Sequence, residues 1–184
     1  MRVVIQRVTE GGVTICREDS REESRAGSCR DESRPTTTRP TTTRPTLTRP
    51  TETTRRIGAG FVILMGVCEE DTLEDVDWLV RKIIGLRVFD DENGVMNRSI
   101  MDVGGDILVV SQFTLYASYK KGNRPSWLRA ARHEVSIPLY EAFCSRLGEA
   151  LGKPVKTGEF GAMMQVSLVN DGPVTICMDT KNKE

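Results

Sequence analysis

Two amphipathic helices among many short strands are the pattern that most limits the folds open to this chain. The first helix is predicted from Thr72, a residue type that caps helix starts, and its apolar side chains then recur at three- and four-residue steps. The second helix is predicted to begin at Ser136 with Pro138 and to end before Gly152 and Pro154. These helices do not alternate strictly with the strands. The order therefore predicts an α+β fold with largely antiparallel β-sheets and two main helices.

The predicted strands are short apolar runs bounded by glycines or turn residues. They lie at 2–8, 13–15, 61–67, 86–89, 95–96, 108–117, 166–169 and 174–178. Gly11-Gly12 predicts a turn between the first two strands, and Asn93-Gly94 predicts a hairpin. The fully apolar run Phe61–Val67 is typical of a buried strand.

The stretch Leu108–Ala117 is the best candidate for a strand that carries a functional site. Its apolar run ends in Ser111-Gln112 and resumes after Thr114, as expected where a buried strand delivers polar groups to a site. The alternative is a core strand whose polar interruption is satisfied by neighbouring hydrogen bonds, and the pattern alone favours this alternative.

Composition indicates one soluble globular domain spanning residues 1–184. Of these residues, 38% are hydrophobic and 28% are charged, which suits a chain with a substantial core. No signal peptide or membrane span is expected, because the longest apolar run, Phe61–Met65, is far too short. The five widely spaced cysteines contain no Cys-x-x-Cys pair, which favours reduced thiols in a cytoplasmic protein.

Residues 17–56 differ in kind from the rest of the chain. Four consecutive five-residue units, beginning at Arg34, each contain an Arg-Pro-Thr sequence. Such a segment has little to bury and cannot offset the cost of ordering its backbone, so we expect a mobile, partly extended insertion in a β-hairpin loop. We hypothesise that the arginines of this segment add non-specific affinity for the phosphate groups of a nucleic acid.

Charge gives little guidance on partners. Residues 17–56 hold ten Lys or Arg and seven Asp or Glu, whereas the whole chain has 26 of each. The best local candidate for a basic surface that binds nucleic acid is the set Lys120, Lys121, Arg124, Arg129 and Arg132. An ordinary solvent-exposed charged surface is at least as good an interpretation of these residues.

Familiar hydrolytic machinery is absent from the sequence. The single histidine, His133, sits in an Arg-rich segment and is expected to be satisfied or to face solvent. No metal-binding motif or phosphate-binding glycine loop occurs, so no metal or other cofactor is expected.

Two motifs nevertheless resemble those of the D-aminoacyl-tRNA deacylase family. The motifs are Ser111-Gln112-Phe113-Thr114-Leu115 and Asn170-Asp171-Gly172-Pro173-Val174-Thr175, accompanied by Ile5–Val8 near the start. The similarity covers residues 1–16 and 57 to about 178. It implies the fold of that family, a homodimer, and hydrolysis of the ester bond of D-aminoacyl-tRNA, which is chiral proofreading in translation. The family has only a short connection where this chain has residues 17–56.

Site residues follow from this similarity together with chemistry. An aminoacyl ester is already activated, and the neighbouring ribose hydroxyl can assist a water molecule, so the protein needs chiefly to orient the substrate and stabilise the oxyanion. Main-chain N–H groups around Phe113 and Thr114 are our candidates for that stabilisation, and Thr114 as a covalent nucleophile is the alternative.

The resemblance also implies that Gly172-Pro173 has a cis peptide bond, enters the active site of the partner subunit and selects D-substrates, with Arg7 fixing it. A plain turn is the structural alternative. The candidates for holding the terminal adenosine are Ser111, Gln112, Phe113 and Met164. For Phe113 and Met164, packing in the hydrophobic core is the alternative interpretation.

Two other functions remain open. One is a non-catalytic nucleic-acid-binding or regulatory protein with the same fold. The other is a deacylase for glycyl-tRNA or another mischarged tRNA, such as an L-alanyl-tRNA. A turnover assay with matched substrates separates them.

Overall fold

The computed structural model describes residues 1–17, 51–120 and 122–183. One six-stranded sheet runs through it, with β1 (Arg2–Arg17) at its centre. The other strands of this sheet are β2 (Thr51–Ile57), β3 (Gly60–Gly66), β6 (Asp106–Ser111), β7 (Lys156–Thr157) and β8 (Met164–Asp179). The short strands β4 (Phe89–Asp90) and β5 (Met96–Arg98) form a separate hairpin.

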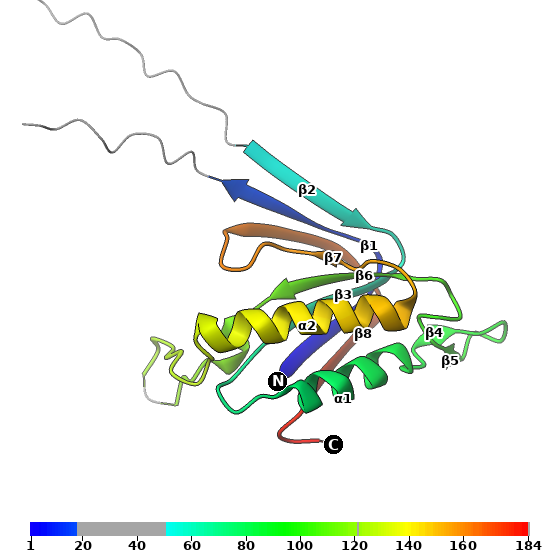
Figure 1. The fold of residues 1–184 in the computed structure, drawn as a ribbon. Helices are drawn as coiled ribbons and strands as arrows, with labels where there is room; N and C mark the ends of the chain where they lie inside the picture. Colours follow the sequence, from blue (N-terminus) through cyan, green and yellow to red (C-terminus); the bar gives the residue numbers. More distant parts are fainter. Residues whose placement is uncertain (18–50, 121, 184) are drawn as a thin grey trace, which may run out of the picture.

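Most strand pairs are antiparallel, as predicted. β1 pairs antiparallel with β2, β3 and β8, whereas β6 pairs parallel with both β3 and β7. The helices α1 (Leu73–Ile84) and α2 (His133–Leu151) lie next to each other against one face of the sheet (Figure 1). The α+β prediction is confirmed.

Alternation along the central strands builds two apolar layers. Phe61, Ile63 and Val109 pack in the larger core cluster beneath the helices, while Val62 and Leu108 belong to a second cluster on the opposite face. This is the two-residue period of a strand buried on both faces. The second cluster is closed by residues from the far half of β1 and from β2, namely Val13 and Ile57.

The predicted turn at Gly11-Gly12 is wrong, because β1 continues through both residues. Gly11 pairs with Ile57 of β2 on one side and with Leu168 of β8 on the other. A Cβ atom at Gly11 would lie 2.6 Å from Cγ2 of Val62. Glycine is thus needed where β1 passes close over β3, a role that sequence alone does not distinguish from a turn.

The boundary predicted for the insertion is also wrong at its end. Residues 51–56 are not loop but part of β2, and Arg17 ends β1, where it pairs with Thr51. Threonine-rich segments suit a strand once a partner is present. The rest of the predicted insertion lies outside the described residues.

Two helix ends lie where their capping residues predict them. Thr72 is the N-cap of α1, and its N–H donates to Oδ2 of Asp75 at 2.9 Å. Gly152, in a left-handed conformation (φ 74°), ends α2 as predicted. The second helix, however, begins at His133 and so places Pro138 inside it; the strand predicted at 86–89 is reduced to Phe89–Asp90.

Asp75 should give the fold a measurable acid sensitivity. Burial opposes its ionisation, but hydrogen bonds from Lys181 and from the Thr72 N–H outweigh burial and lower the pKa of Asp75 from 3.8 to about 2. A lowered pKa in the folded state stabilises the protein above pH 3.8, and this contribution disappears as pH falls toward 2. We expect about 2 kcal/mol of unfolding free energy to depend on it.

Urea unfolding of the parent protein and of Asp75→Asn between pH 7 and pH 2 measures this contribution. The variant should be less stable at neutral pH and should lose correspondingly less stability on acidification. Equal pH dependence in the two proteins would show that Asp75 does not carry the effect.

Candidate active site

The polar end of β6 opens into a pocket at the edge of the sheet. β3 and β6 run parallel and pair Met65 with Ser111, and the N–H of Gln112 donates to the Met65 carbonyl at 2.7 Å. The chain then forms a 3₁₀ helix, η1 (Phe113–Tyr116). The prediction of a strand through to Ala117 is therefore wrong beyond Ser111, because the chain leaves the sheet once its partner β3 ends.

Four of the predicted binding residues line one pocket of about 640 Å³, within the range of sites for small organic groups. They are Ser111, Gln112, Phe113 and Met164. Met164 comes from the start of β8, far along the chain from the other three. The tertiary structure thus joins the predicted adenosine-binding residues into one cavity.

Main-chain donors are available beside this pocket. Within η1 the first hydrogen bond runs from the N–H of Leu115 to the carbonyl of Gln112, at 3.2 Å. The N–H groups of Phe113 and Thr114 precede that bond and have no acceptor inside the helix. Donors of this kind can stabilise negative charge that develops on a substrate oxygen.

Thr114 itself lies outside the set of residues that line the pocket. Its Oγ1 accepts a hydrogen bond from Nε2 of Gln112. An amide N–H is a donor and cannot remove the hydroxyl proton, so this contact orients Thr114 without activating it as a nucleophile.

Other residues of the pocket were not predicted as site residues. His133 is exposed, as expected, but it also lines the pocket, where its ring packs edge-on against Phe160 at 5.7 Å between centroids. Tyr140 and Trp127 contribute further aromatic wall. These residues are scattered over the loop before α2, α2 itself and the segment before β8, so no local motif joins them.

Neither Tyr140 nor Cys144 supplies a reactive anion at this site. The Tyr140 hydroxyl donates to the Val109 carbonyl at 3.0 Å, and burial raises the pKa of its phenol far above the usual value. Burial likewise raises the pKa of the Cys144 thiol to about 12, so the thiol stays protonated at neutral pH. Within the ranges that the structure describes, no three His, Cys, Asp or Glu side chains are grouped so as to hold a metal ion.

Gly172 and Pro173 form a second group, which is joined by a cis peptide bond as expected. They do not lie in a turn between two strands, because β8 continues through them as one strand with a bulge: Gln6 pairs with Thr175 and Val8 pairs with Asn170. The chain keeps its direction there and only bows outward. Both residues are exposed.

Arg7 lies beneath this bulge and fixes it. Its side chain is buried, and its Nε donates to the carbonyl oxygen of Asp171 at 3.2 Å and lies 3.1 Å from Oδ2 of the Asp171 carboxylate. Nη1 donates to the Val88 carbonyl at 2.6 Å. A rigid cation held from two sides thus positions the exposed Gly-Pro pair.

The two groups lie apart within one chain. Along β3, Arg7 pairs with Phe61 and Ser111 pairs with Met65, so four residues, or about 13 Å of strand, separate the two positions. Arg7, Gly172 and Pro173 are not among the residues that line the pocket. One copy of the chain therefore holds the pocket and the Gly-Pro bulge as separate surfaces.

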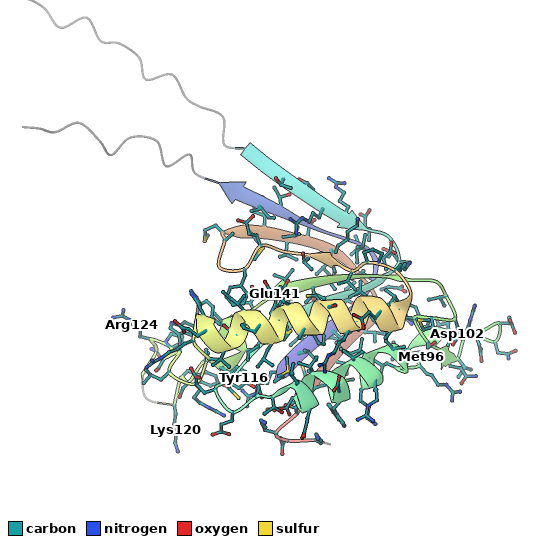
Figure 2. All side chains as sticks on the ribbon, in the orientation of Figure 1. Met96, Asp102, Tyr116, Lys120, Arg124 and Glu141 are labelled. Carbon is teal, nitrogen blue, oxygen red and sulfur yellow. The ribbon has the colours of Figure 1, made fainter. Side chains whose placement is uncertain are left out.

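A strongly basic loop borders the pocket. The chain carries no acidic residue between Asp106 and Glu134, whereas Lys120, Lys121, Arg124, Arg129 and Arg132 all lie in that interval. Lys120 and Arg124 project from the end of the molecule at which α2 begins (Figure 2). No helix in the described part of the chain is long and apolar enough to cross a membrane.

Fold and pocket together define an α+β protein with a cavity where two central parallel strands end and with main-chain N–H groups beside that cavity. Comparison with known proteins then gives the family. The sequence profile of the family "D-Tyr-tRNA(Tyr) deacylase" matches residues 42–179. A protein from Phocaeicola vulgatus named D-aminoacyl-tRNA deacylase is 56% identical over 184 aligned residues and covers 100% of both chains. The chain belongs to the D-Tyr-tRNA(Tyr) deacylase family.

Solved structures agree on the fold. One of a protein named "c-Myc DNA Unwinding Element Binding Protein" is 34% identical, covers 97% of this chain and 98% of its own, and has a TM-score of 0.72. Another, of a probable eukaryotic D-amino acid tRNA deacylase, is 17% identical with a TM-score of 0.65 over 96% of this chain and 97% of its own, and supports the fold alone.

One relative also bears on residues 18–50. The D-aminoacyl-tRNA deacylase of Parabacteroides distasonis is 60% identical over 129 residues, which are 70% of this chain and 86% of the relative, so the relative is about 150 residues long. Its length falls short of this chain by about the length of that segment.

Proposed function

We propose that this protein hydrolyses the ester bond of D-aminoacyl-tRNA and releases free tRNA and the D-amino acid. The observation that carries the proposal is the pocket at the end of β6, whose aromatic lining includes Phe113 at the first position of η1, where the N–H groups of Phe113 and of the adjacent Thr114 have no acceptor inside the helix. The names of the relatives from Phocaeicola vulgatus and Parabacteroides distasonis support the same activity.

The chemistry needs little from side chains. Water attacks the ester carbonyl carbon, and the bond between this carbon and the ribose oxygen breaks. The proton of the water passes by way of the neighbouring ribose hydroxyl to the departing ribose oxygen. Negative charge that develops on the carbonyl oxygen is stabilised by the N–H groups of Phe113 and Thr114. Ser111, Gln112, Phe113 and Met164 hold the terminal adenosine so that the ester lies beside these donors.

Selection of the D-configuration is assigned to Gly172-Pro173 of a second copy in a homodimer. In one chain the pair is exposed and remote from the pocket, whereas Arg7 already holds it rigidly. Main-chain atoms can contact the α-amino group and the α-hydrogen without reading the amino-acid side chain. A filter of this kind accepts many D-amino acids.

Single-turnover deacylation of D-tyrosyl-tRNA and L-tyrosyl-tRNA in a chelator-containing buffer tests the proposal. Release from the D-substrate alone is expected. Release from neither, with tRNA still bound, would instead support the nucleic-acid-binding alternative, which the name of the 34% identical protein of known structure brings into consideration. Release of glycine from glycyl-tRNA at the same rate would support the broader deacylase alternative.

Thr114→Val should leave most of the activity in place. Valine keeps the shape of threonine and removes only a hydroxyl whose partner is the Gln112 amide. We expect less than about a tenfold loss in kcat, whereas loss of a covalent nucleophile would cost ~10⁴-fold or more. Thr14→Val, which removes a β1 hydroxyl whose partner is the hydroxyl of Thr54, is a matched control. A loss of the larger size together with a trapped acyl-enzyme would reassign Thr114 as the nucleophile.

We infer a cytoplasmic location from the tRNA substrate. The cysteines Cys68, Cys144 and Cys177 are free thiols, which fits a reducing compartment.

A further inference from the structure

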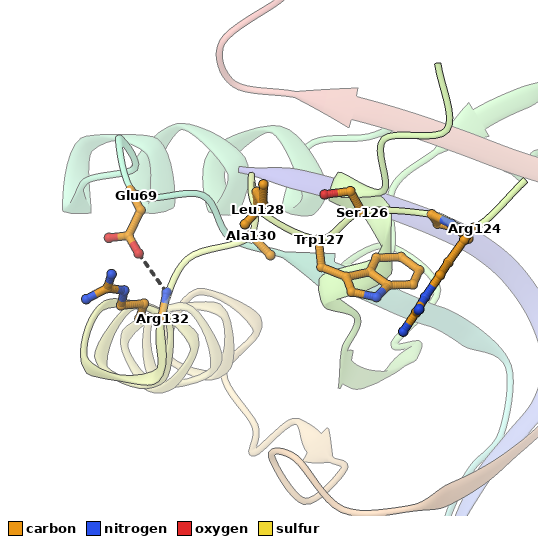
Figure 3. Close-up of a pocket in the computed structure, with 8 residues that line it drawn as sticks. Glu69, Arg124, Ser126, Trp127, Leu128, Ala130 and Arg132 are labelled. Atoms are coloured by element: carbon orange, nitrogen blue, oxygen red, sulfur yellow. Dashed lines mark hydrogen bonds between the residues drawn. The ribbon is translucent and has the colours of Figure 1, made fainter. Parts of the chain in front are cut away.

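A second hollow adjoins the pocket, and the proposed activity does not use it. It has a volume of about 850 Å³ and is lined by Glu69, Arg124, Ser126, Trp127, Leu128 and Arg132, among others. Trp127, Ala130 and Arg132 line both cavities, so the two lie side by side. In Figure 3, Arg124 and Trp127 stand at one side of the hollow, and Glu69 and Arg132 at the other.

Four large aromatic or apolar side chains of the segment 113–128 are exposed. Trp127 is 40% exposed, Phe113 56%, Tyr119 76% and Leu128 94%. Large exposed side chains gathered at one place mark a binding surface more often than chance exposure does.

Trp127 is held as a rigid platform. Its indole packs edge-on against the ring of Phe113, with 5.3 Å between centroids. Just before it, Ser118 and Ser126 exchange two main-chain hydrogen bonds of 2.8 Å. Just after it, the N–H of Ala131 donates to the Val67 carbonyl at 2.9 Å and so ties the loop to the end of β3. A ring fixed in this way loses little freedom when a flat ligand stacks on it.

The charge at this hollow is positive. Arg124 and Arg132 line it, and Lys120 and Arg129 lie in the same exposed loop. Glu69 is the acidic residue among the lining residues, and its Oε1 accepts the main-chain N–H of Arg132 at 2.8 Å, where α2 begins. One carboxylate therefore stands against two guanidinium groups, which leaves the lining with a net positive charge.

An aromatic platform beside arginines is the chemistry that recognises single-stranded nucleic acid, because bases stack on the ring and phosphates pair with the cations. We propose that this hollow, the Trp127 hollow, binds the unpaired nucleotides that immediately precede the terminal adenosine of the tRNA. A base stacks on Trp127 and its phosphate pairs with Arg124. The inference rests on the proposed function, since it takes the terminal adenosine to occupy the neighbouring pocket.

Binding of two short ligands tests the inference without any turnover. One ligand is the RNA tetranucleotide ACCA, and the other is adenosine, which carries only the terminal nucleoside. Isothermal titration is performed with the full chain and with Trp127→Ala, Trp127→Phe and Arg124→Ala. Trp78→Phe and Arg81→Ala, both on α1, are the matched controls.

We expect Trp127→Ala to weaken the binding of ACCA about tenfold. Trp127→Phe should keep most of the affinity of the parent protein, because a phenyl ring still stacks on a base. Arg124→Ala should weaken the binding of ACCA. It should also make the negative slope of log K against log salt concentration less steep by about 0.7, as expected for the loss of one phosphate contact. Adenosine affinity should change less than twofold in Arg124→Ala, and in Trp127→Ala, whose ring lines both cavities, it should fall less than the affinity for ACCA.

Three results would overturn the inference: ACCA affinity unchanged in Trp127→Ala, equal weakening of ACCA and adenosine, or no binding of ACCA by the parent protein. Equal weakening would assign Trp127 to the adenosine pocket. Deacylation is measured separately: Arg124→Ala, at a residue that lines the Trp127 hollow but not the adenosine pocket, should raise KM for D-tyrosyl-tRNA more than it lowers kcat. A parent protein that binds ACCA through Trp127 but hydrolyses no D-aminoacyl-tRNA would contradict the proposed function and leave the Trp127 hollow standing.

Discussion

Replacing Gly172 with alanine is expected to reduce deacylation of D-tyrosyl-tRNA by about a thousandfold while the protein stays folded. Gly172 has φ of 118°, and a Cβ atom there would lie 3.0 Å from Nη2 of Arg7 and 2.9 Å from Cγ2 of Val174. The bulge must therefore shift or release Arg7. Displacement of a positioning group by about 1 Å can cost two orders of magnitude in rate, and loss of the α-carbon contacts adds to this.

Gly94→Ala is the matched control for backbone cost. Gly94 also has a positive φ, 72°, but a Cβ atom added there would meet no other atom within 4 Å, and the residue sits in the hairpin between β4 and β5. Gly94→Ala should lose about 1–2 kcal/mol of stability from its backbone conformation alone, and Gly172→Ala should lose at least as much, because its added Cβ also meets Arg7 and Val174. If Gly94→Ala lost as much activity as Gly172→Ala, the effect would be one of general stability.

Coexpression of two inactive variants decides whether the site is shared between subunits. One chain carries Gly172→Ala and the other carries Phe113→Pro in the pocket, with different C-terminal tags. A heterodimer then has one site in which both changes meet and one site with neither. After random pairing, about a quarter of the parent activity should return, because half of the dimers have one of two sites intact. No recovery would place both groups in the same chain's site.

Replacing Phe113 with proline should lower kcat by about 10²–10³-fold relative to Phe113→Ala. Proline removes the main-chain N–H proposed to stabilise the oxyanion, and loss of one such donor costs that much in other hydrolases. Its fixed φ suits the first position of η1, and Gln112 before it is not helical (φ −144°, ψ 79°).

Phe113→Ala is the reference because it removes the same ring and keeps the N–H. Single-turnover rates with saturating enzyme separate the chemical step from binding of the tRNA. Circular dichroism and urea unfolding check that η1 and the core survive both changes. Equal rates for the two variants would show that the Phe113 N–H does not contact the developing charge.

The elements predicted best are those fixed by neighbouring residues. α1 begins at its Thr72 cap and α2 ends at Gly152, since capping and helical periodicity act within a few residues. The apolar run at 61–67 is strand β3 almost as predicted. Ser111, Gln112, Phe113 and Met164 are also predicted to bind the substrate, and one pocket unites all four of them.

Local pattern is enough to predict the α+β class, the start of α1, the end of α2, the buried strand at 61–67 and the motifs of the deacylase family. Long-range contacts are needed to show that Gly11 continues a strand, that β8 bulges at Gly172 and that Trp127, His133 and Phe160 line one pocket. The tertiary structure also separates that pocket from Arg7 in a single chain. These features depend on contacts between residues far apart along the chain, where pairing partners and close packing override what each segment favours alone.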